Sequence, residues 1–141
     1  MSAHPALYSR AMERIARCGC GQLSATCRGE PVRVSVCHCH ACQRRTGGPF
    51  SAQARFPENA VTMAGAFKVW EKIGDGGRRA WFRWCTACGG TVAYTNEGRG
   101  EIAIPLGGFA GGDVPVPRVS VYEDRRQPWV EIVADDIVRE A

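Results

Sequence analysis

Short stretches in which hydrophobic and polar residues alternate recur along the chain. In Val32–Val36 the three valines fall on one face, and in Phe50–Phe56 two phenylalanines and two alanines fall on one face with polar residues opposite. A period of two residues is typical of a strand that buries one side. Both segments are therefore predicted to be half-buried strands.

Eight further segments are rich in β-branched and aromatic residues, which favours strands. They are Leu23–Arg28, Ala60–Met63, Phe67–Glu71, Ala80–Trp84, Thr91–Thr95, Glu101–Leu106, Val119–Tyr122 and Trp129–Val133. Turns that contain glycine or proline separate them, and no linker divides the chain. The pattern predicts an all-β sandwich or folded sheet.

Helical patterns are few. Residues 6–16 fit a helical face poorly, and Ala41 to Arg45 predicts only a short turn, so neither can anchor a helical fold. The length of 141 residues corresponds to about one domain. We expect residues 1–11 to form a flexible leader and residues 12–141 to form a single domain.

The eight cysteines are unusual for a chain of this kind. The N-terminus lacks the apolar segment of a signal peptide, and no stretch approaches the ~20 apolar residues of a membrane span. These features predict a cytoplasmic protein with no membrane partner. Disulfides are rare in that compartment, so the cysteines are expected to be metal ligands or catalytic groups.

The chain carries a mild excess of positive charge, with 18 Lys and Arg against 14 Asp and Glu, a net charge of +4. The arginines are dispersed, and the densest groups are the pairs Arg44-Arg45, Arg78-Arg79 and Arg125-Arg126. Nucleic-acid-binding surfaces concentrate their charge, so a solvated surface is favoured over a nucleic-acid site. The pairs could equally meet a small anionic substrate.

Two close pairs of cysteines have the spacing of zinc knuckles. Cys18 and Cys20 form one pair, and Cys85 and Cys88 form the other. Zinc prefers four thiolates in a tetrahedron, and two such pairs supply a complete set. Glycines follow both pairs and permit the positive φ angles that such turns need. The spacing predicts a structural zinc site.

Three more thiols, Cys37, Cys39 and Cys42, lie within six residues. Three ligands with a fourth position open are typical of a catalytic zinc site. Two alternatives remain: His38, His40 or a distant residue closes a second structural site, or the thiols form a metal-free redox trio. Arg44 and Arg45 would help to keep the thiolates ionised.

The remaining cysteine and the four tryptophans are predicted to belong to the core. Cys27 shares a strand face with apolar residues, and a free buried cysteine packs as a small hydrophobe. The tryptophans, Trp70, Trp81, Trp84 and Trp129, are more often core residues than a stacking platform.

The cysteine motifs resemble those of the glutathione-dependent formaldehyde-activating enzyme family, which includes centromere protein V. The matching segments are CGCG from Cys18, CHCHACQRRTGGPF from Cys37, WCTACGG from Trp84 and VYEDRRQPWV from Val121. The resemblance runs from about Cys18 to Ile137. The order and spacing of these four segments make a chance match improbable. The chain departs from the family at Ala16, where members often have glycine.

The resemblance implies a mostly β, Mss4-like fold with minimal helix. It implies a structural zinc on Cys18, Cys20, Cys85 and Cys88, and a second zinc on Cys37, Cys39 and Cys42 at the active centre. The activity that it implies is that of a carbon–sulfur lyase, which forms S-(hydroxymethyl)glutathione from glutathione and formaldehyde. Arg44, Arg45 or Arg55 could then pair with the glutathione carboxylates.

Two other functions stay open at this stage. A non-catalytic zinc module that binds protein or nucleic acid would suit the positive charge, although its dispersal argues against nucleic acid. A thiol redox sensor would use Cys37, Cys39 and Cys42 without metal. The residues do not settle which thiol, which aldehyde or which oligomeric state applies.

Overall fold

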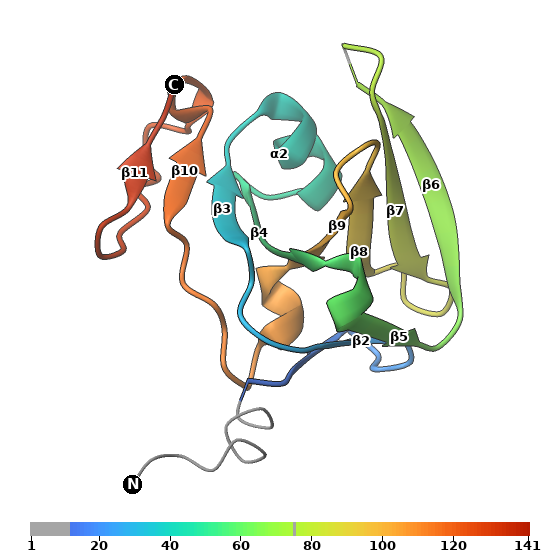
Figure 1. Ribbon diagram of the computed structural model, residues 1–141. Helices are drawn as coiled ribbons and strands as arrows, with labels where there is room; N and C mark the ends of the chain where they lie inside the picture. The colour runs from blue at the N-terminus through green and yellow to red at the C-terminus, as the bar shows by residue number, and fades with distance from the viewer. Residues whose placement is uncertain (1–11, 75) are drawn as a thin grey trace, which may run out of the picture.

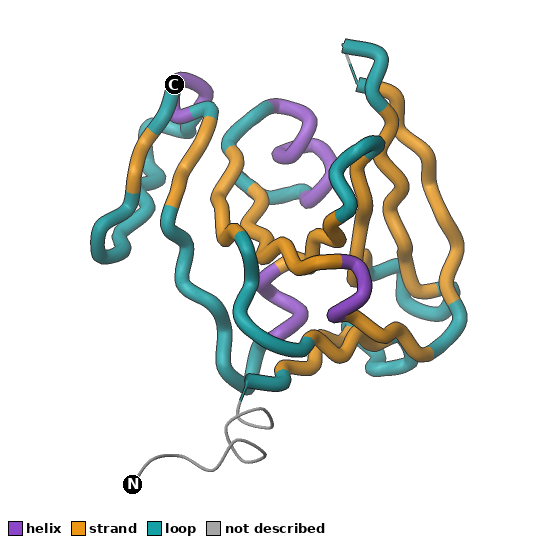
Figure 2. Tube along the Cα trace, in the orientation of Figure 1, coloured by secondary structure: helices purple, strands orange, loops and turns teal. Residues whose placement is uncertain are grey.

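A computed structural model describes residues 12–74 and 76–141, so the predicted leader at residues 1–11 lies outside the described residues. The chain is mostly β, as predicted, and its strands form two sheets (Figure 1 and Figure 2). The smaller sheet is antiparallel, with the order β1-β2-β5. Its strands are β1 (Arg14–Arg17), β2 (Ser24–Cys27) and β5 (Val61–Ala64).

The larger sheet has the strand order β11-β10-β3-β4-β9-β8-β7-β6. Its strands are β3 (Arg33–Cys37), β4 (Ser51–Pro57), β6 (Phe67–Ile73), β7 (Arg79–Cys85), β8 (Thr91–Asn96), β9 (Glu101–Pro105), β10 (Val119–Val121) and β11 (Val138–Arg139). Strand β10 runs parallel to both β3 and β11, whereas the other neighbours are antiparallel. Two of the seven neighbouring pairs in this sheet, β10 with β3 and β4 with β9, join strands that are not consecutive in the chain.

Helix is minimal. The predicted turn near Ala41 is the α-helix α2 (His40–Thr46), which lies over one face of the larger sheet (Figure 1). Three 3₁₀ turns complete the described elements, at Glu58–Ala60, Leu106–Phe109 and Glu123–Arg125. None of the described helices has the length and apolar character needed to cross a membrane.

Two predictions of secondary structure are wrong. The described part of the weak helix at residues 6–16 contains β1 instead, because pairing with β2 places Ala16 opposite Ala25 and buries both methyl groups. The segment Trp129–Val133 is not a strand. Only Val130 of its apolar side chains is buried, whereas Trp129 and Val133 are 74% and 83% exposed, so no strand face is covered there, and the last strand is β11. The other predicted strands are confirmed.

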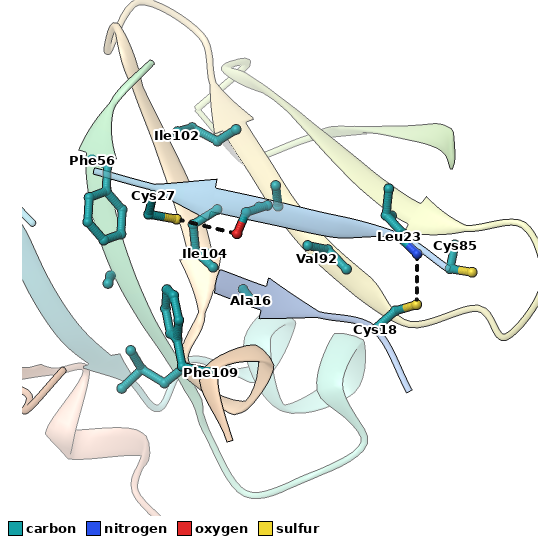
Figure 3. Packing of buried hydrophobic residues seen from close by; sticks show 14 of the residues in the cluster. Ala16, Cys18, Leu23, Cys27, Phe56, Cys85, Val92, Ile102, Ile104 and Phe109 are labelled. Carbon is teal, nitrogen blue, oxygen red and sulfur yellow. Dashed lines mark hydrogen bonds between the residues drawn. The ribbon is translucent and has the colours of Figure 1, made fainter. Parts of the chain in front are cut away.

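The hydrophobic core lies between the two sheets (Figure 3). Leu23, directly before β2, and Cys27 of β2 reach it from one side, and Phe56 and Ile104 reach it from the larger sheet, all fully buried. Cys27 therefore packs as predicted. The larger sheet buries its opposite face as well, because Ser51, Gln53 and Arg55 of β4 alternate with the core residues yet are also buried. The prediction of a half-buried strand at Phe50–Phe56 is wrong, since β4 is covered on both sides. The prediction for Val32–Val36 is wrong in the same respect, since the polar Ser35 is buried and Val32 is exposed.

Close packing between β1 and the Leu106–Phe109 turn gives a test of this core. A Cβ added to Gly108 would lie 3.0 Å from the Cβ of Ala16. We expect Gly108→Ala to lower the free energy of unfolding by about 1–3 kcal/mol, because the contact is too short to accept a methyl group. Combined with Ala16→Gly, which removes the opposing methyl group, it should cost less than the sum of the two single substitutions. Urea denaturation measures both.

The neighbouring Gly107 provides the control. A Cβ there meets nothing within 4 Å, so Gly107→Ala should leave the denaturation midpoint nearly unchanged. A Gly108→Ala protein as stable as the unmodified chain would contradict this packing.

Candidate functional site

Four cysteines that are far apart in sequence come together at one end of the two sheets. The Sγ atoms of Cys18, Cys20, Cys85 and Cys88 all lie within 4.8 Å of one another. Cys20 Sγ is 3.7 Å from Cys18 Sγ and 3.7 Å from Cys85 Sγ. Four thiolates at ~2.3 Å from a zinc ion would have edges of ~3.8 Å, so this donor set fits a tetrahedral metal site.

Backbone and side-chain N–H groups surround these sulfurs. Leu23 N donates to Cys18 Sγ at 3.2 Å (Figure 3), and Gln22 Nε2 donates to Cys85 Sγ at 3.1 Å. The amide of Cys88 is the main cause that lowers the pKa of Cys85 to about 6. A thiol that ionises this easily is a ready ligand for a cation.

Tight turns present both cysteine pairs. The predicted positive φ is found at Gly21 (+81°) and Gly89 (+81°), which follow the two pairs. Glycine adopts this conformation at little cost, so the chain can reverse directly after each knuckle. The turns thereby direct two sulfurs from each sheet toward one point.

The second cluster contains Cys37, Cys39 and Cys42, whose Sγ atoms also lie within 4.8 Å of one another. Cys37 ends β3, Cys39 is the N-cap of α2, and Cys42 lies in the first turn of that helix. The cap brings two of the thiols together, because Cys42 N donates to Cys39 Sγ at 3.4 Å. Three sulfurs therefore point to one place from a strand end and a helix start.

The surroundings shift the pKa values of Cys42 and Cys37 in opposite directions. Hydrogen bonding from Cys37, supported by the Ser51 hydroxyl, Cys39 and the charge of Arg45, lowers the pKa of Cys42 to about 5. The same hydrogen bond, together with burial, raises the pKa of Cys37. At neutral pH the cluster therefore carries negative charge, which suits it to hold a metal cation.

Neither neighbouring histidine completes the three-cysteine cluster. Among the described residues, no His, Asp or Glu atom joins the three sulfurs within 4.8 Å. His40 is exposed, whereas His38 is fully buried and its Nε2 lies 2.9 Å from Ser120 Oγ. The alternative of a site closed by these histidines is therefore not favoured.

The C-terminal part of the chain anchors the loop that carries the cluster. Ser120 Oγ donates to Glu123 Oε2 at 2.6 Å, which links the buried His38 to the turn after β10. Gln43 Nε2 donates to the carbonyls of His38 (2.7 Å) and Arg125 (3.2 Å). These bonds hold both ends of the Cys37–Cys42 segment in place.

A cavity of about 760 Å³ opens beside the three cysteines, all of which line it. Its floor is a row of register partners that crosses six strands of the larger sheet. From one edge inward, the row reads Trp70, Phe82, Tyr94, Ala103, Arg55 and Arg33. Ala103 itself is fully buried and does not line the cavity; because it is small, the Arg55 guanidinium can reach over it and lie above the Tyr94 ring, 5.6 Å from the ring's centre.

The cavity is strongly basic. Among the residues that the structure describes, one acidic side chain, Glu97, lines it together with eight basic ones: Arg33, Arg44, Arg45, Arg55, Lys72, Arg78, Arg79 and Arg99. Two of the arginine pairs seen in the sequence thus converge on one cavity, whereas Arg125-Arg126 does not line it. Positive charge inside a concave site favours a small anionic ligand over a nucleic-acid duplex.

Arg45 joins α2 to the far wall of the cavity. Its guanidinium lies 4.9 Å from the centre of the Phe82 ring and 5.1 Å from that of Tyr94, which stack on each other at 4.7 Å. These cation–π contacts hold the helix over the sheet. They also place a positive charge close to Cys42, as expected for Arg45, while Arg44 shows no such effect.

Sequence reasoning missed several residues of the cavity wall. Trp70 was expected in the core but is 49% exposed and lines the cavity, and Trp129 is also exposed. No sequence motif includes Arg33, Lys72 or Arg99. Arg33 and Lys72 share the alternation within their strands, and only the strand register aligns them on one face, whereas Arg99 lies in the loop between β8 and β9.

Comparisons with known proteins agree with the fold and the cysteine motifs. The family described as glutathione-dependent formaldehyde-activating enzyme matches residues 13–125. No curated protein matches the chain. A crystal structure of a Rhodobacter sphaeroides protein is similar in fold, with a TM-score of 0.54 and 16% identity over 90% of this chain and 99% of that one. Because the family match covers most of its length, the chain belongs to the glutathione-dependent formaldehyde-activating enzyme family.

Proposed function

We propose that this protein is a zinc-dependent carbon–sulfur lyase that joins glutathione to formaldehyde at Cys37, Cys39 and Cys42. The observation that carries the proposal is the opening of this three-sulfur cluster into a basic cavity. Family membership supports the reaction class. A cluster with three protein ligands leaves a position for substrate, as catalytic zinc sites do.

The second cluster has a different role in this proposal. Cys18, Cys20, Cys85 and Cys88 would hold a structural zinc, since four sulfurs leave no coordination position for a substrate. Cys18 and Cys85 also belong to the hydrophobic core. Metal bound there would tie the turn after β1 to the turn after β7.

The reaction forms one carbon–sulfur bond. The thiolate sulfur of glutathione attacks the aldehyde carbon, the C=O π electrons move to oxygen, and that oxygen takes up a proton to give the hydroxymethyl thioether. A zinc ion on three thiolates supplies either a lowered thiol pKa or a Lewis acid for the aldehyde. Basic residues of the cavity bind the carboxylates and hold the thiol near the cysteines.

Tyr94 is placed to serve the proton transfer. Burial raises the pKa of Tyr94 to about 12, so its hydroxyl stays protonated at neutral pH. The residue lines the cavity together with the three cysteines. We propose that it donates a hydrogen bond to the oxygen that becomes negative during the attack.

The metal assignment predicts a distinct zinc content for each cluster. The unmodified protein should contain about two zinc ions per chain, and Cys42→Ala should contain about one and remain folded. Cys88→Ala should also lose about one zinc, but with a clearly lower melting temperature because the lost metal is structural. Elemental analysis and thermal denaturation measure both. Equal zinc content in Cys42→Ala and the unmodified protein would contradict the second site.

The catalytic assignment predicts an enzyme-dependent exchange. In exchange NMR, the protein should speed interconversion between glutathione plus formaldehyde and their adduct, and Cys42→Ser should reduce this acceleration by about 100-fold. Cys27→Ala is the matched control, because its thiol lies in the core away from both clusters. If the unmodified, zinc-loaded protein gave no acceleration at saturating glutathione, the proposed reaction would be wrong.

A further inference from the structure

Arg55 is a buried cation without a carboxylate partner among the described residues. It lies on β4 in the cavity floor and is 9% exposed. Its Nη1 donates to Asn96 Oδ1 at 2.9 Å, and none of the ion pairs in the described ranges includes it. Removing a guanidinium from water without a counter-charge is costly.

A second positive charge faces the same place. Arg33 is the direct register partner of Arg55 across the β3–β4 pair, and like charges directly opposite in a sheet are unfavourable. Burial lowers the pKa of Arg55, and the charges of Arg99 and Arg33 act in the same direction, whereas Tyr94 and Glu101 act against them. Glu101 is paired with Arg99 at 3.4 Å, so among the described residues no carboxylate pairs directly with Arg55.

Another largely buried arginine, Arg14, has carboxylate partners. The side chain of Arg14 is 11% exposed, and its Nη2 lies 3.1 Å from Asp113 Oδ2 and 3.7 Å from Glu30 Oε1. Where an arginine lies outside the cavity, two carboxylates thus compensate its charge. The contrast indicates that the counter-charge of Arg55 comes from a ligand.

The position of Arg55 relative to the thiols fixes the span of such a ligand. Cys37 pairs with Ser51 and Arg33 pairs with Arg55, so the two pairs are four residues apart along the strands. At ~3.3 Å per residue this separation is ~13 Å. The glutathione thiol is on the middle residue, so one arm of the peptide, from the sulfur to a terminal carboxylate, covers part of this separation, and the long arginine side chains reach the remaining distance.

We propose that Arg55 and Arg33 form an oxyanion site that binds a carboxylate or phosphate group of the substrate at the far end of the cavity from the cysteine cluster. The identification of that ligand as the thiol substrate rests on the proposed function. The binding of an anion at Arg55 and Arg33 does not depend on the proposed function. Arg55 supplies the buried, oriented charge, and the more exposed Arg33 covers the anion from the neighbouring strand.

Calorimetric titration of the zinc-loaded protein tests the site with three probes. Glutathione carries carboxylates, glutathione diethyl ester has the same thiol with both carboxylates blocked, and inorganic phosphate is a free oxyanion. We expect Arg55→Met to weaken glutathione binding by about 10- to 100-fold and to leave ester binding unchanged. Arg33→Gln should weaken glutathione binding in the same direction but less.

The melting temperature without ligand distinguishes a binding role of Arg55 from a structural role, because the two roles predict opposite changes. Arg55→Met should keep or raise the melting temperature, because it removes an uncompensated buried charge. The matched control Arg14→Met should lower it, because two carboxylates lose their partner. If Arg55→Met lowered the melting temperature as Arg14→Met does, and both Arg55→Met and Arg33→Gln bound glutathione and phosphate like the unmodified protein, the oxyanion site would be overturned.

The results of these experiments distinguish failure of the oxyanion site from failure of the proposed lyase activity. Phosphate binding that depends on Arg55, without glutathione binding or adduct exchange, would retain the site, identify its ligand as a phosphate, and reject the glutathione reaction. Adduct exchange with binding that is insensitive to both arginine substitutions would retain the reaction and reject the site.

Discussion

Coverage of the larger sheet on both faces is the constraint on which the rest of this structure depends. Because strand side chains alternate, each residue of a central strand belongs either to the core or to the cavity. On β4, Ala54 and Phe56 contact the core, while Gln53 and Arg55 line the cavity. A shift of one residue in register would move a charged side chain into the core, so folding and site formation are the same event.

The two cysteine clusters lie on opposite faces of the larger sheet. Cys18 and Cys85 belong to the core between the sheets, whereas Cys37 and Cys42 border the cavity on the other face of the larger sheet. A stabilising metal in the first cluster would strengthen the contact between the sheets. The second cluster sits where a strand end meets a helix N-terminus, which leaves its sulfurs accessible from the cavity.

Local patterns predicted what depends on local sequence. The alternation in Val32–Val36 and the spacing of the cysteines correctly indicated β3 and the two groups of thiols. The helix at residues 6–16 failed because pairing with β2 decides the conformation of its described end. The strand at Trp129–Val133 failed because apolar composition does not reveal whether a face is covered.

The cavity could not be predicted because it is a product of strand order. Its floor joins β4 to β9, a pairing between segments about 50 residues apart that no local pattern encodes. The arginine pairs Arg44-Arg45 and Arg78-Arg79 looked dispersed for the same reason. Once the register is known, Arg55 and Arg33 stand out as two arginines that are direct partners on neighbouring strands.

The central claim is that the three cysteines and the Arg55–Arg33 pair are two ends of one substrate site. A crystal structure of the zinc-loaded protein with glutathione tests it most directly. The account predicts the glutathione sulfur beside Cys37, Cys39 and Cys42, with a carboxylate of the same molecule paired to Arg55. A fourth protein side chain completing the three-cysteine cluster, or glutathione bound outside the cavity, would contradict it.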